Sequence, residues 1–172
     1  MKIPLPGAGD VYQRVILDHG RQPRNRAPPP AAAQSARGDN PLCGDELTVW
    51  IERDGDRIAN IGFEGAGCAL CLASASMLTV RVKGATLAET RALGRAFDQL
   101  LSGGAGAGGA GTAAAAAATA ADAGASEPEL GDLAAFSGAS RFPVRVKCAR
   151  LAWRTLSRLL DGDAHLEGEP IK

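Results

Sequence analysis

The residues best suited to chemistry in this chain are three cysteines and one aspartate that lie far apart in the sequence. They are Cys43, Asp45, Cys68 and Cys148. Thiolate sulfur and carboxylate oxygen are both zinc ligands, and four such groups complete a tetrahedral shell. The sequence therefore predicts that the fold gathers these four side chains around one metal ion.

Cys43 and Asp45 are separated only by Gly44. If this segment is extended, side chains two positions apart face the same side and can reach one cation. The alternative is a buried free cysteine beside a turn aspartate, and these residues alone do not decide between the two.

Cys148 follows two cations, Arg145 and Lys147, and lies near the start of a predicted helix. Neighbouring positive charge and a helix N-terminus both favour a thiolate, so a lowered pKa is expected for this thiol. The alternative is a buried helix cysteine beside solvated charges.

Cys68 and Cys71 form a C-x-x-C pair. A zinc ribbon would need a second such pair, and a thioredoxin-type pair would need a βαβ setting. Cys71 is therefore expected to be a packing residue or a spare thiol. His19 and His165 have no cysteine or carboxylate at ligand spacing, so both are expected to be surface histidines.

The elements that must position these groups begin with a hairpin. Residues 46–52 alternate apolar and polar side chains as a strand does, Asp54-Gly55 is a strong turn signal, and residues 57–63 return as a second strand. The outer ends of a hairpin lie side by side. Cys43 and Asp45 should therefore be neighbours of Cys68.

Helices are expected on both sides of this hairpin. One is capped by Asp10 and ends near Gly20; a second covers residues 69–82; a third starts at Thr86 with a Thr86–Glu89 capping box; the last covers about 144–160. Residues 23–41 are expected to form an extended loop, and the alanine- and glycine-rich residues 103–125 a flexible insertion. The whole chain, 1–172, is expected to be a single domain.

Composition limits the classes of function. The formal net charge is zero, which argues against a general nucleic-acid binder, and no run of about 20 strongly apolar residues is present. The N-terminus does not read as a secretory signal, so a cytoplasmic protein is expected. In that reducing compartment, four cysteines are better interpreted as metal ligands or reactive thiols than as disulfides.

Several motifs, taken together and in order, resemble the SufU/IscU family of iron–sulfur cluster assembly proteins, which is similar to the N-terminal part of NifU. The motifs are Tyr12 with Asp18-His19 and Pro23-Arg24-Asn25, then Asn40-Pro41-Leu42-Cys43-Gly44-Asp45, then Phe63-Glu64-Gly65-Ala66-Gly67-Cys68 with Ala73-Ser74-Ala75-Ser76-Met77, and Phe142-Pro143-Val144-Arg145-Val146-Lys147-Cys148-Ala149 with Leu151-Ala152-Trp153. Lys147 stands where IscU proteins carry a histidine, and extra sequence precedes the last segment. Both features resemble the SufU branch.

The resemblance implies a compact α+β domain, with a small antiparallel β-sheet packed against several helices as in SufE and NifU-like proteins. It implies zinc bound by Cys43, Asp45, Cys68 and Cys148. It also implies a SufS-type cysteine desulfurase as partner, with a SufBCD-type scaffold as a candidate downstream partner.

The function implied is that of a zinc-dependent sulfurtransferase, in which Cys43 accepts persulfide sulfur and Arg145 steadies the thiolate or a site carboxylate. Two alternatives stay open. The same cysteines suit iron, so the protein could be a scaffold for a [2Fe–2S] cluster. It could also be a structural zinc module used only for binding.

Overall fold

The computed structural model describes residues 8–103 and 128–162, with side chains from residue 13 onward. In chain order its elements are α1 (Ala8–Arg21), β1 (Gln34–Asn40), β2 (Asp45–Asp54), β3 (Arg57–Ala66), α2 (Ala69–Val82), α3 (Leu87–Leu101), a 3₁₀ helix η1 (Gly131–Arg141) and α4 (Pro143–Leu160). Nearly all of the expected insertion, the C-terminal tail and His165 lie outside the described residues. α1 begins before Asp10, so the expectation that Asp10 caps it was wrong.

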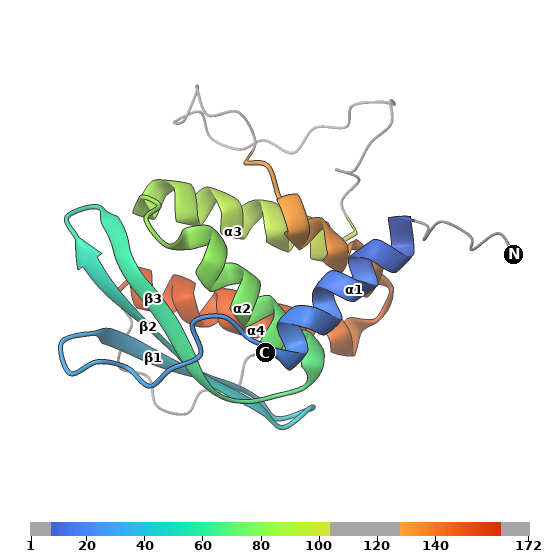
Figure 1. The fold of residues 1–172 in the computed structure, drawn as a ribbon, viewed down its shortest axis with the longest axis horizontal. Coiled ribbons are helices and arrows are strands. Elements are labelled where there is room, and N and C mark those ends of the chain that lie inside the picture. The colour runs from blue at the N-terminus through green and yellow to red at the C-terminus, as the bar shows by residue number, and fades with distance from the viewer. Residues whose placement is uncertain (1–7, 104–127, 163–172) are drawn as a thin grey trace, which may run out of the picture.

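The three strands form one antiparallel sheet in the order β1-β2-β3 (Figure 1). The β2–β3 hairpin predicted from alternation is confirmed, with Asp54 opposite Arg57 at the turn and Glu46 opposite Ala66 at the open end. Gly55 has a φ of +59°, which suits glycine at this tight turn. The hairpin therefore delivers Asp45 and the segment before Cys68 to the same end of the sheet.

β1 corrects the expectation of an extended loop over residues 23–41. Gln34–Asn40 pairs along its length with β2, from Gln34 opposite Ile51 to Asn40 opposite Asp45. Its inward positions are small: Ala36 and Gly38 are buried. A Cβ on Gly38 would lie 2.1 Å from Thr155 Oγ1 of α4, so glycine is what lets the strand and helix approach.

Helices α2 and α4 pack against the sheet, and α1, α3 and η1 surround them (Figure 1). α2 runs through the centre of the molecule, with buried residues on most of its circumference. Ser74 Oγ of α2 donates a 2.6 Å hydrogen bond to the Ala149 carbonyl of α4, which ties together the two helices that carry Cys68 and Cys148 at their N-terminal ends.

A cluster of three aromatic side chains lies at the other side of α4, among α3, η1 and α4. Phe97 stacks on Trp153 at 4.9 Å and meets Phe136 edge-on at 5.4 Å. The predicted capping box at the start of α3 is confirmed, since Thr86 and Glu89 exchange both of its hydrogen bonds. The helix predicted from residue 144 begins at Pro143.

The α+β architecture with a small antiparallel sheet and flanking helices is confirmed. Among the described residues, no helix is long and apolar enough to span a bilayer.

Candidate metal centre

Cys43 sits on a tight turn between β1 and β2. The amide groups of Cys43 and Gly44 both donate to the Asn40 carbonyl, at 3.1 and 2.9 Å, and Gly44 has a φ of +68°. The segment is therefore not extended, as the spacing argument assumed. Asp45 is the first residue of β2, and the left-handed glycine directs the chain from the exposed Cys43 to the buried Asp45.

Cys148 lies directly against this turn. Its Sγ is 3.1 Å from Cys43 Sγ, and the Asn40 side-chain amide donates to the same sulfur at 3.6 Å. Cys148 is the sixth residue of α4 and is buried. The predicted meeting of Cys43 and Cys148 from remote parts of the sequence is what the structure shows.

Asp45 joins Cys68 to the same site. Its Oδ1 accepts the Cys68 amide at 2.7 Å, and its Oδ2 lies 3.9 Å from Cys68 Sγ. The Cys68 sulfur also accepts the Cys71 amide at 3.5 Å and so caps the first turn of α2. A helix N-terminus stabilises negative charge on a sulfur placed there.

The glycine-rich stretch before Cys68 makes room for these contacts. A Cβ on Gly65 would lie 2.1 Å from the Glu46 carbonyl oxygen, and Gly65 has a φ of +130°. A Cβ on Gly67 would meet the Asp45 carboxylate and the Cys71 sulfur at 3.1 Å each. The Gly65 position therefore needs a residue with no side chain, and a Cβ at Gly67 would be tight against Asp45 and Cys71.

The donor set fits a metal ion. The ligand atoms of Cys43, Asp45 and Cys148 lie within 4.8 Å of one another. Cys68 lies outside that tight group and reaches it through Asp45 Oδ2. Ligand atoms around tetrahedral zinc are roughly 3.3–3.8 Å apart, which is close to the 3.1 Å between the Cys43 and Cys148 sulfurs and the 3.9 Å between Asp45 Oδ2 and Cys68 Sγ. For all four residues to bind one ion, Cys68 would have to move closer to the other three.

The buried carboxylate gives independent support. Asp45 is 1% exposed, yet the four ion pairs among the described residues all use other acids. Buried carboxylates are normally paired or bound to a metal. Its 2.7 Å hydrogen bond comes from the neutral Cys68 amide, so a cation among Asp45 and the cysteines would supply the opposite charge.

The sequence-based expectation of a lowered pKa for Cys148 was wrong for the metal-free protein. Burial raises the pKa of this thiol, and the neighbouring Asp45 and Cys43 raise it further. The adjacent cations do not compensate, because Arg145 and Lys147 are exposed to solvent. Burial in the core outweighs charges that are close in sequence but point outward.

Cys71 is the packing residue that the sequence predicted. It is fully buried, belongs to the main hydrophobic core, and its pKa is raised chiefly by burial. Its backbone amide donates to the Cys68 sulfur, and its own sulfur lies beside Gly67.

Arg145 lies on the exposed face of α4, with its guanidinium 4.4 Å from the centre of the Phe142 ring. Within the part of the chain that the structure describes, it makes no hydrogen bond to a cysteine or to Asp45. Its proposed role stays a prediction that requires the side chain to leave Phe142.

Two further residues differ from the sequence-based view. His19 is half-buried rather than on the surface, because its Nδ1 lies 2.8 Å from Ser76 Oγ, and burial lowers its pKa. Asn40 was considered only as part of the turn, yet its side chain contacts Cys148. The burial of an asparagine at a strand end could be seen only once β1 was recognised.

Comparisons with known proteins agree with this geometry. The chain is 32% identical over 150 residues to the zinc-dependent sulfurtransferase SufU of Bacillus subtilis (strain 168), covering 86% of this chain and 88% of that one. It is 28% identical over 165 residues to the iron–sulfur cluster assembly scaffold protein IscU of Streptococcus pyogenes serotype M1, covering 94% and 92%.

Solved structures share the fold. The FiSufU protein of the SUF system from Fervidobacterium islandicum AW-1 superposes with a TM-score of 0.70 at 27% identity, over 90% of this chain and 99% of that one. The N-terminal NifU-like protein of Brucella abortus, at 22% identity and a TM-score of 0.65, shows the fold alone.

Residues 11–149 match the model of the NifU-like N terminal domain, which covers every cysteine and the aspartate of the site. The resemblance drawn from the sequence motifs is thereby confirmed. The chain belongs to the NifU-like N terminal domain family, the family of the SufU- and IscU-type iron–sulfur cluster assembly proteins.

Proposed function

We propose that this protein is a zinc-dependent sulfurtransferase that takes persulfide sulfur from a SufS-type cysteine desulfurase for iron–sulfur cluster assembly. The observation that carries the proposal is the contact between an exposed thiol and a buried one: Cys43 on its turn, 3.1 Å from Cys148, beside the buried Asp45. The similarity to SufU, named for this activity, supports the same conclusion.

Cys43, Asp45, Cys68 and Cys148 would hold the zinc ion. Bound zinc keeps coordinating thiols deprotonated at neutral pH, and the thiolate is the form that attacks sulfur. Asp45 would orient Cys68 by accepting its amide, and the burial of Asp45 and Cys148 would exclude water from the inner side of the site.

Cys43 would be the sulfur acceptor. Its thiolate attacks the outer sulfur of the donor persulfide, a new S–S bond forms on Cys43, and the donor cysteine leaves as a thiolate. The bond that forms and the bond that breaks are both sulfur–sulfur bonds, so no external oxidant or reductant is needed. The turn suits this role because Cys43 is exposed and a Cβ on the adjacent Gly44 would meet nothing within 4 Å.

Arg145 would steady the attacking thiolate or a carboxylate at the site after swinging away from Phe142. We place the reaction in the cytoplasm, where the four free thiols would stay reduced. A SufBCD-type scaffold is the proposed downstream partner.

The test compares two cysteine variants. Purified wild-type protein should raise the turnover of a SufS-type desulfurase and should gain the mass of one sulfur atom on Cys43. Cys43→Ala should do neither. Cys71→Ala, a cysteine outside the proposed ligand set, should behave as wild type. Full stimulation by Cys43→Ala would refute Cys43 as acceptor.

A second function, assembly of a [2Fe–2S] cluster at the same cysteines, is favoured by the similarity to IscU scaffold proteins. Metal analysis of protein purified without air separates the two. Tightly bound zinc supports sulfur transfer, whereas labile iron with sulfide and visible absorbance supports the scaffold.

A further inference from the structure

The chain has zero formal net charge, yet one of its helices is strongly basic. α4 contains five cations and no acidic residue, and the same helix carries Cys148 on its buried side. These cations are Arg145, Lys147, Arg150, Arg154 and Arg158. Because no acidic residue of α4 offsets these five cations, a protein with zero net charge carries a local concentration of positive charge on this helix.

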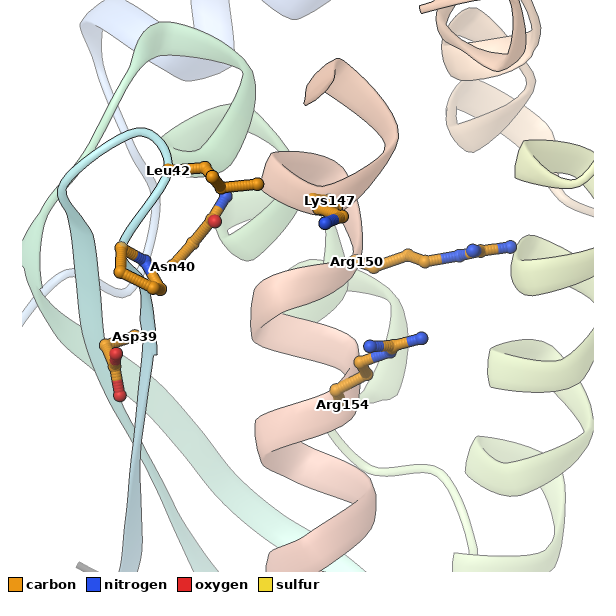
Figure 2. A pocket seen from close by; sticks show the side chains of 7 residues that line it. Asp39, Asn40, Leu42, Lys147, Arg150 and Arg154 are labelled. Atoms are coloured by element: carbon orange, nitrogen blue, oxygen red, sulfur yellow. The ribbon is translucent and has the colours of Figure 1, made fainter. Parts of the chain in front are cut away.

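Three of these cations form a ridge beside the candidate metal centre. Lys147, Arg150 and Arg154 follow helical spacing on one face of α4. Together with residues 39–42 they line a cavity of about 110 Å³. Figure 2 shows Asp39, Asn40 and Leu42 on one side of this hollow and the three cations projecting from α4 on the other. We name these lining residues the α4 groove.

The positive charge of the α4 groove is only partly neutralised. Arg150 is paired with Asp98, with 2.6 Å between its Nε and Oδ1, and also donates to Ser102 Oγ. Lys147 and Arg154 are exposed and make no ion pair within the described residues. Asp39 is the one acid among the residues that line the groove. Two charges are therefore open to an outside partner.

The α4 groove also has an apolar contact point and leads to Cys43. Leu42 lines it, is 65% exposed and directly precedes Cys43. A chain segment bound here would lie next to the exposed thiol. Acidic side chains would pair with Lys147 and Arg154, and an apolar side chain would cover Leu42.

We infer that the α4 groove docks an acidic segment of the protein that donates sulfur to Cys43. This inference rests on the proposed function and adds to it the surface through which the donor is recognised. Opposite charges across an interface accelerate encounter and fix its register, which a transfer between two cysteine side chains requires.

The experiment measures binding of a SufS-type cysteine desulfurase to zinc-loaded protein by calorimetry, at low salt and at about 0.15 M salt. Arg154→Glu is the test variant. Lys83→Glu is the control because it makes the same change in charge at an exposed position. It lies at the far end of the 14-residue α2 from Cys68, roughly 21 Å away along the helix.

Arg154→Glu should weaken binding about ten-fold at low salt, and by less at the higher salt, because exposed charges are screened there. Lys83→Glu should stay within about two-fold of wild type. Both variants should keep the wild-type zinc content and should accept sulfur on Cys43 from a small-molecule persulfide at the wild-type rate, which shows that the site itself is intact.

Equal binding by wild type and Arg154→Glu would overturn the inference and leave the proposed function standing. Absence of any binding by wild-type protein would overturn both. A titration with a single-stranded oligonucleotide covers the other class of acidic partner: binding as tight as that of the desulfurase, and lost in Arg154→Glu, would overturn the assignment to a protein segment.

Discussion

The turn that carries Cys43 and the helix that carries Cys148 meet at a sulfur–sulfur contact, but their surroundings differ sharply. On the turn, Leu42 and Cys43 are exposed and a Cβ on Gly44 would touch nothing within 4 Å. On α4, Cys148 is 3% exposed and is followed by the fully buried Ala149. One side of the site can therefore be changed without disturbing the core, whereas the other side is part of it.

This comparison predicts that substitutions at buried positions lower the free energy of unfolding more than substitutions on the exposed turn. Four substitutions test it, ordered by the expected change in the free energy of unfolding.

The largest effect is expected for Asp45→Ala in zinc-loaded protein. If zinc binds only the folded protein, it would stabilise that state by about 4 kcal/mol when free zinc is about 1,000 times its dissociation constant. Most of that gain should disappear when the buried carboxylate is removed. Thermal unfolding with and without zinc measures it. The control is Glu46→Ala, because Glu46 is an exposed neighbour whose ion pair is with Arg37, and this variant should keep the full zinc effect.

Gly38→Ala should lower the free energy of unfolding by about 1–3 kcal/mol, because its Cβ would overlap Thr155 Oγ1. Denaturant titration measures the change. Gly138→Ala is the matched control, since a Cβ there meets nothing within 4 Å, and should stay within about 0.5 kcal/mol of wild type. A Gly38→Ala protein as stable as the control would mean that β1 does not lie against α4.

Cys71→Ala should cost about 1 kcal/mol, because a small buried side chain is lost from the core. Its zinc content should equal that of wild type. Loss of zinc in this variant would show that Cys71 is a metal ligand and not a packing residue of the core.

Cys43→Ser should have the smallest effect on stability, within about 0.5 kcal/mol in metal-free protein, because the side chain is exposed. Its acceptance of persulfide sulfur, followed by mass spectrometry, should nevertheless be abolished. A large loss of stability without metal would contradict the view that the turn is independent of the core.

The sequence predicted the parts of the fold that have strong local signals. The alternation over β2, the Asp54-Gly55 turn and the Thr86–Glu89 capping box each determine local geometry, and each is present in the structure. The contact between Asp45 and Cys68 followed from the hairpin alone.

The sequence did not predict features that depend on tertiary packing. β1 carries small inward residues, Ala36 and Gly38, instead of an alternating apolar pattern, and it is a strand because β2 and α4 accept it. The raised pKa of Cys148 likewise results chiefly from burial, which could not be predicted from a sequence that places two cations beside it. The contact of Asn40 with Cys148 depends on the pairing of β1 and on the burial of Cys148, so it could not be predicted either.

The sulfur of Cys68 belongs to two structures at once, because it faces Asp45 and also caps the first turn of α2. A metal ion bound to Cys68 would withdraw electron density from this sulfur and so weaken the cap at the start of α2, a helix with buried residues on most of its circumference. Metal-loaded and metal-free protein would therefore differ in how firmly the first turn of α2 is held.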